Sequence, residues 1–145
     1  MSTCTWINYG IGLCTSSLTL KSVEAIEKLL SKAPSFSQEI HEYFEECGID
    51  EPEIQDYVDY DEDYHNGIAY ILKEVIEERE GVFLTACDDV NGNDYLIFPQ
   101  MYPWELNWKE RRMTRMKVES LLKKYLSIIT DDPLDIDDIQ AENYG

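Results

Sequence analysis

Charge is distributed very unevenly along this chain, and any fold of the chain must accommodate that distribution. Between Glu39 and Asp63 lie twelve carboxylates and no Lys or Arg, and a second run without basic residues, Asp131–Glu142, adds six more. Seven of the twelve basic residues fall within Lys109–Lys124, which carries +5, whereas the rest has 28 acids against 5 bases, or −23. Because like charges at this density repel one another and oppose compaction, we expect them on an outer surface that meets a basic partner.

The acidic run is nevertheless expected to be folded. Its carboxylates are interleaved with apolar side chains such as Ile40, Phe44 and Ile54, and the whole chain is 43% hydrophobic and 12% aromatic. Disordered acidic segments are usually poor in aromatic residues. A length of 145 residues suits one domain, residues 1–145, with a core of its own.

The first half of the chain predicts one strand followed by helices. Residues 3–14 are rich in β-favouring side chains, and Gly10 and Gly12 indicate a bend or the close approach of another backbone. Apolar residues then recur at helical spacing through two segments. The expected boundary signals are Ser22 and the capping-box pair Ser35 and Gln38 at helix starts, and Pro34 and Gly48 at helix ends.

The second half predicts more helices and a hairpin. A short helix is expected over 51–57, a strong one over 64–80, and a last one from Thr114. Between them, Asn91-Gly92 separates two β-rich runs and predicts a hairpin over 81–99. The fold class is therefore α+β: a small, mainly antiparallel sheet, built from the N-terminal strand, the hairpin and a C-terminal edge strand, covered by four to five helices.

The sequence lacks the motifs of an enzyme, and no catalytic residue, cofactor or metal ligand is assigned. His41-Glu42 begins like a zinc-protease motif, but the second histidine is missing. Asp59, Asp61 and Asp63 alternate as in a calcium loop, but Tyr64 occupies the position that requires glycine. Phosphate-binding loops, dinucleotide fingerprints and CxxC pairs are absent from the sequence.

The sequence favours a cytoplasmic location. The first residues lack the basic and apolar regions of a signal peptide. None of the apolar runs reaches the roughly 20 residues needed to cross a bilayer. Anionic lipid surfaces would also repel a chain whose net charge is −18.

The acidic run is the predicted partner-binding site. Tyrosines next to carboxylates suit an interface with a basic protein, because the rings can stack on arginine while the carboxylates pair with it. The alternative is that these rings pack into the core. The predicted contact residues are Glu39, Glu42, Glu45, Glu46, Asp50, Glu51, Glu53, Asp56, Tyr57, Asp59, Tyr60, Asp61, Glu62 and Asp63.

In size, charge and lack of catalytic motifs, the chain resembles the small acidic proteins that phages and other mobile elements use against host nucleases, including restriction enzymes and CRISPR effectors. The resemblance is at the level of this class and includes no shared motif. It implies a DNA-mimicking inhibitor, not an enzyme, that blocks the nucleic-acid site of a basic protein and does not itself bind nucleic acid. An immunity protein or antitoxin, or a non-inhibitory interaction module, meets the same electrostatic demand. The basic segment 109–124 is expected to face the protein's own acidic surface or that of a second copy in a homodimer.

Overall fold

The sheet has four strands in the order β2-β3-β1-β4, and all its neighbouring pairs are antiparallel. The computed structural model describes residues 5–60, 67–99 and 103–144. Its elements are β1 (Thr5–Cys14), α1 (Val23–Leu30), α2 (Pro34–Glu46), α3 (Ile54–Val58), α4 (Gly67–Glu80), β2 (Thr85–Asp88), β3 (Asp94–Pro99), the 3-10 turns η1 (Pro103–Glu105) and η2 (Glu110–Arg112), α5 (Arg115–Ile129) and β4 (Asp137–Tyr144). The predicted α+β class, with its hairpin and C-terminal edge strand, is confirmed.

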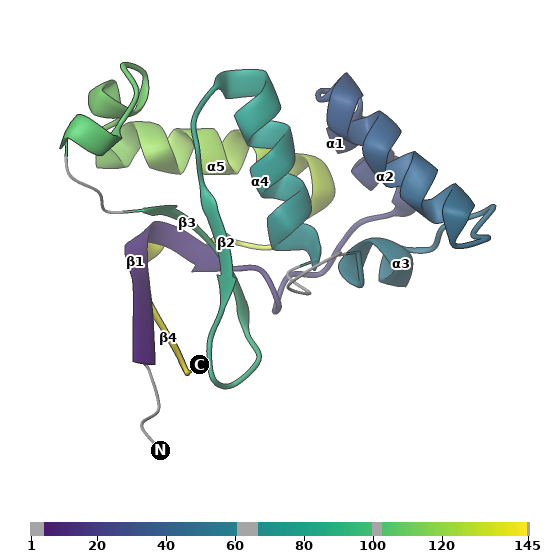
Figure 1. The fold of residues 1–145 in the computed structure, drawn as a ribbon, viewed down its shortest axis with the longest axis horizontal. Helices are drawn as coiled ribbons and strands as arrows, with labels where there is room; N and C mark the ends of the chain where they lie inside the picture. Colours follow the sequence, from purple (N-terminus) through teal and green to yellow (C-terminus); the bar gives the residue numbers. More distant parts are fainter. Residues whose placement is uncertain (1–4, 61–66, 100–102, 145) are drawn as a thin grey trace.

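The helices lie in two groups relative to the sheet (Figure 1). α4 contacts β2 and β3, and α5 contacts β1, so these two helices cover one face of the sheet. The helices α1, α2 and α3 pack against α4 and α5, on the side away from most of the sheet. The described part of the predicted acidic site therefore lies on α2, α3 and the turn between them, at one end of the molecule, whereas the sheet lies toward the other (Figure 1).

The glycines of β1 allow two backbones to approach closely, as the sequence predicted. A Cβ atom placed on Gly10 would lie 2.0 Å from the carbonyl oxygen of Phe98, and one on Gly12 would lie 2.0 Å from that of Leu96. Both contacts are with β3, the neighbour of β1 in the sheet. A side chain at either position would require backbone movement, so glycine is needed for this pairing.

The uncovered face of the sheet curls around a second, small apolar cluster. Cys87, Ile97 and Ala141 are buried there, from β2, β3 and β4 respectively. The N–H of Val90, in the hairpin loop, donates to the carbonyl oxygen of Glu142 at 3.0 Å. This bond joins the hairpin loop to the edge strand β4, next to the buried Ala141.

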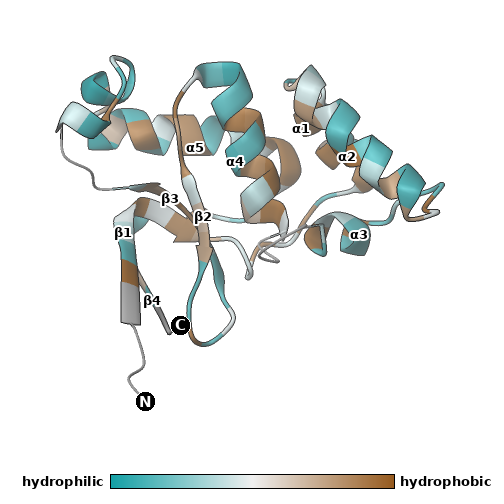
Figure 2. Ribbon diagram, viewed as in Figure 1, coloured by the Kyte–Doolittle hydropathy of each residue, from teal (hydrophilic) through white to brown (hydrophobic). Residues whose placement is uncertain are grey.

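The main core lies between the sheet and the helices, and α4 is its centre. Apolar residues cover much of α4, and the brown ribbon in Figure 2 marks its apolar turns. Ile71, Leu72, Val75 and Ile76 are each 0% exposed. This agrees with the spacing that predicted a strong helix over 64–80, of which residues 67–80 are described.

Two predicted boundaries around α2 are wrong. Helix α1 starts at its predicted cap, Ser22, and ends at Leu30. Pro34 was predicted to end that helix, but it is the first residue of α2. Proline suits the first turn of a helix, where its missing N–H is not needed. The predicted capping box of Ser35 and Gln38 is absent: the N-cap is Ala33, which offers no side-chain bond.

Candidate partner-binding surface

Four of the predicted contact residues, Glu39, Glu42, Glu45 and Glu46, are exposed on α2. The opposite side of this helix buries Phe36, Ile40 and Phe44, so the helix is amphipathic and its carboxylates face outward. α2 ends in a tight turn at Gly48, whose φ of 74° is the left-handed conformation that glycine adopts without strain. The turn directs the chain into a second acidic stretch.

That second stretch continues the surface around α3. Asp50, Glu51, Glu53 and Asp59 are exposed, and Asp56 is half-buried. The Asp56 carboxylate accepts the backbone N–H of Glu53 at 2.7 Å, which caps the start of α3. Asp61, Glu62 and Asp63, as well as Tyr64, lie outside the described residues. We call the following nine the acidic surface: Glu39, Glu42, Glu45, Glu46, Asp50, Glu51, Glu53, Asp56 and Asp59.

No basic side chain neutralises the acidic surface within the described part of the chain. The ion pairs of residues 5–60, 67–99 and 103–144 that involve Lys or Arg all lie elsewhere. The side-chain donors near the surface are neutral amides: Gln38 donates to Glu42 at 3.0 Å, and Gln55 donates to Asp59 at 2.9 Å. None of these nine carboxylates is therefore paired with a Lys or Arg side chain of the described residues.

The two described tyrosines of the predicted site belong to the core. Tyr57 is 0% exposed and Tyr60 is 2% exposed, and both rings pack edge-on against Phe44. The structure therefore matches the alternative that the sequence left open for these two rings, packing into the core. The two rings pack α3 and Tyr60, two residues beyond its end, against α2.

Glu27 connects α1, α2 and α3 behind the acidic surface, a contact that no local sequence pattern predicts. Its carboxylate accepts the hydroxyl hydrogen of Tyr57 from α3 and lies 2.9 Å from Nε2 of His41 on α2. Burial, followed by the bond to Glu27, raises the pKa of Tyr57 well above its usual range. His41, which begins the incomplete zinc-protease motif, thus contacts a carboxylate of α1.

An open groove runs beside the acidic surface, between the start of α1 and α3. Val23, Pro52 and Ile54 contribute apolar atoms to its lining, and polar atoms come from Glu24, Glu51, Glu53 and Gln55. Its volume is about 710 Å³. A basic residue with a long apolar stem fits this lining, because the stem can cover the apolar atoms while its charge meets the carboxylates.

The basic segment pairs with acids outside the acidic surface. Arg115 lies 2.9 Å from Asp137 and 3.1 Å from Asp138, both on β4. Lys124 lies 3.0 Å from Glu80, at the end of α4. Among the described ion pairs, the basic segment thus reaches two residues of the second acidic run and none of the acidic surface. Its contact with a second copy stays a prediction.

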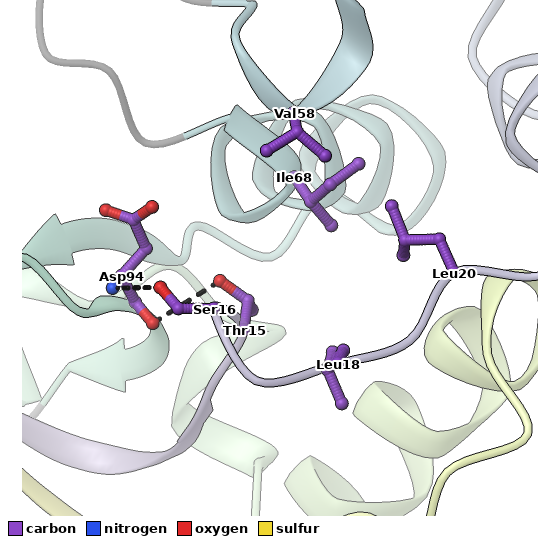
Figure 3. A pocket seen from close by; sticks show the side chains of 7 residues that line it. All are labelled: Thr15, Ser16, Leu18, Leu20, Val58, Ile68 and Asp94. Carbon is purple, nitrogen blue, oxygen red and sulfur yellow. Dashed lines mark hydrogen bonds between the residues drawn. The ribbon is translucent and has the colours of Figure 1, made fainter. Parts of the chain in front are cut away.

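A small cavity of about 140 Å³ lies near the end of β1 (Figure 3). Leu18, Leu20, Val58 and Ile68 surround it with apolar atoms, and the polar groups on its other side bond to one another. The backbone N–H of Asp94, for example, donates to Oγ of Ser16 at 2.7 Å. Ligand pockets usually measure about 300–1,000 Å³, so this cavity is small for a substrate.

In the described ranges, no group of three His, Cys, Asp or Glu side chains is arranged to hold a metal ion. None of the helices seen there combines the length and apolarity needed to cross a bilayer. The acidic surface and its groove are thus the most distinctive features of the described structure. Comparison of the chain with protein-family models, with curated proteins and with solved structures finds no match.

Proposed function

We propose that this protein is an acidic inhibitor that occupies the nucleic-acid site of a basic protein in the cytoplasm, such as a host nuclease or a CRISPR-type effector. One observation carries the proposal: nine carboxylates on α2, α3 and the turn between them have no Lys or Arg partner in the described structure. Desolvating an uncompensated charge is costly unless a partner supplies the opposite charge. A basic groove supplies it.

The spacing of the charges on α2 supports nucleic-acid mimicry. The four carboxylates from Glu39 to Glu46 span about 10 Å of helix axis at 1.5 Å per residue. That is about one charge per 3 Å, close to the one per 3.4 Å of a single DNA strand. A groove built to bind phosphates with Lys and Arg would find a similar charge density here.

The fold also holds these carboxylates in place. The rings of Phe44 on α2 and Tyr57 on α3 pack against each other, and Glu27 of α1 contacts both of the other helices. Because the helices are fixed before binding, fewer degrees of freedom are lost when the partner docks. Unlike nucleic acid, this surface offers no phosphodiester bond that a nuclease could cleave.

The groove beside α3 favours one alternative, an immunity protein or antitoxin that is shaped to a single basic toxin. Its apolar lining of Val23, Pro52 and Ile54 would select a partner by shape as well as by charge. A mimic that relies on charge alone needs no such groove. The two functions differ in whether substitutions in the groove alone weaken binding.

Charge reversal on α2 tests the proposal. Tagged protein is used to capture partners from the native host, and nucleic acid is added as a competitor. The variant E39K/E42K/E46K should lose the partner, since like charges facing each other across an interface cost several kcal/mol. If added nucleic acid does not release the captured partner, this protein does not occupy the partner's nucleic-acid site.

The matched control reverses three exposed acids outside the acidic surface, in D131K/D135K/E142K. It changes the net charge equally and should keep the partner. Asp132 and Asp137 are unsuitable, because Asp132 accepts the N–H of Thr19 and Asp137 pairs with Arg115 and with the N–H of Asp138. Asp131 pairs with Lys21 at 3.2 Å, but its side chain is 87% exposed, and exposed ion pairs contribute little to stability. Equal loss of binding in both variants would show that total charge matters and its location does not.

A further inference from the structure

The segment 104–117 runs from η1 through η2 to the first turn of α5, and it exposes three large apolar side chains. Trp104, Trp108 and Met116 are 72%, 65% and 76% exposed. Single exposed apolar residues are common, but three in one short segment are typical of an interaction site. We call residues 104–117 the basic–aromatic segment.

This exposure belongs to an ordered part of the structure, because a buried carboxylate anchors the segment. Glu110 is 3% exposed and accepts the backbone N–H groups of Phe83 at 2.7 Å and Asn107 at 2.9 Å. Asn107 in turn donates its side-chain amide to the carbonyl oxygen of Gly81 at 2.9 Å. The segment is thus held against the chain that leads into β2, and its tryptophans are presented from a fixed backbone.

Positive charge surrounds one of these rings. The Nζ of Lys109 lies 5.8 Å from the centre of the Trp108 ring, and the Cζ of Arg112 lies 5.4 Å from it. Arg115 pairs with Asp137 and Asp138, and the segment has four further basic residues against two acidic ones, of which Glu110 is buried. Tryptophan and arginine are enriched at the centres of protein interfaces, so this composition suits an acidic protein surface as the partner.

The acidic surface and the basic–aromatic segment lie at opposite ends of the molecule's long axis (Figure 1). We infer that copies of this chain associate head to tail, with the basic–aromatic segment of one copy seated on the acidic surface of the next. The charges of the two surfaces are complementary, and the exposed rings would gain apolar burial in the contact. This arrangement also keeps the acidic surfaces of neighbouring copies about one molecule apart.

Extended anions fit the segment less well than a second copy does. A nucleic-acid strand or an anionic membrane continues past the segment and faces the remainder of a protein whose net charge is −18. Self-association of this kind joins two different surfaces and therefore adds copies without closing a two-fold dimer. It would also compete with any partner of the acidic surface.

Variants with one intact end test the inference. E39K/E42K/E46K leaves the basic–aromatic segment intact, and W108A/R112E leaves the acidic surface intact. At about 0.15 M salt, where charges are screened beyond about 8 Å, sedimentation velocity should show wild-type protein forming dimers and larger species as its concentration rises. Each variant alone should remain monomeric, and an equimolar mixture should form a dimer of twice the mass and nothing larger.

Controls of the same charge change should behave like the wild type. These are D131K/D135K/E142K for the acidic end and K123E for the basic end, and circular dichroism checks that every variant is folded. If W108A/R112E does not fold, R112E alone replaces it. W108A/R112E should still capture the partner of the acidic surface. A failure of self-association can therefore be distinguished from a failure of the proposed function.

Several results would overturn the inference. The inference is wrong if the wild-type protein stays monomeric into the millimolar range. It is also wrong if the mixture of the two variants does not dimerise. Oligomers that persist in both variants would place the contact on another surface. Binding of a single-stranded oligonucleotide or of phosphatidylserine vesicles that is lost in W108A/R112E would identify a different occupant of the segment.

Discussion

The carboxylate of Glu78, on α4, accepts the backbone N–H of Phe36 at the start of α2, at 2.9 Å. Its second oxygen accepts the N–H of Ser35 at 3.1 Å. The first amides of a helix have no partners within the helix, and its N-terminus carries partial positive charge. Because the N-cap residue Ala33 supplies no side-chain acceptor, Glu78 of α4 supplies the acceptors for this end of α2.

We expect Glu78→Ala to lower the free energy of unfolding by about 1–2 kcal/mol, the usual cost of a lost helix cap with its charge. Glu78→Gln keeps one acceptor oxygen and should cost less. Urea unfolding followed by circular dichroism measures both. If the alanine variant is as stable as the wild type, the start of α2 does not depend on this contact.

The glycines allow a sharper test of packing. Gly12→Ala places a methyl group against the carbonyl oxygen of Leu96, and we expect a loss of at least about 3 kcal/mol or failure to fold. Gly48→Ala is the matched control, because nothing lies within 4 Å of the added atom. Its positive φ alone should cost about 1–2 kcal/mol. Equal effects on thermal unfolding would contradict the close approach of β1 to β3.

Local signals in the sequence predicted most of the fold. Ser22, the predicted cap of α1, accepts the N–H of Ala25 at 3.1 Å, and Thr114, the predicted start of the last helix, accepts that of Lys117 at 3.2 Å. Both contacts join neighbouring residues. The start of α2 could not be predicted in this way. Its cap comes from Glu78, 42 residues beyond Phe36 in the chain, and no local pattern reveals such a contact.

The same distinction applies to the candidate site. The carboxylates of α2 are exposed as the helical spacing of Phe36, Ile40 and Phe44 predicted. The orientation of Tyr57 depends on a distant partner, because a buried hydroxyl needs an acceptor and Glu27 provides it. Alternation of tyrosine and aspartate along the sequence could not decide between a core ring and a surface ring.

Arg115 holds the edge strand to α5, and its removal should loosen that strand locally. Its guanidinium contacts Asp137 at 2.9 Å and Asp138 at 3.1 Å, and the pKa of Asp137 is lowered by a backbone bond and by Arg115. We expect Arg115→Ala to leave global stability nearly unchanged, since exposed ion pairs contribute little. Hydrogen exchange at the start of β4 should become faster, and Lys123→Ala, on the same helix, should not change it. Unaltered exchange in the Arg115 variant would contradict this role.

The contact between Tyr125 and Glu80 should make stability depend on pH in acid. The Tyr125 hydroxyl donates to Glu80 at 2.7 Å, and this bond, with Lys124 at 3.0 Å, lowers the pKa of Glu80 below its ordinary value of 4.5. A lowered native-state pKa stabilises the fold above the unfolded pKa, and the contribution is lost as pH falls through the native value. Tyr125→Phe removes the bond, so its cost in urea unfolding should be larger at about pH 7 than at about pH 3. An equal cost at both pH values would show that the hydroxyl acts through packing alone.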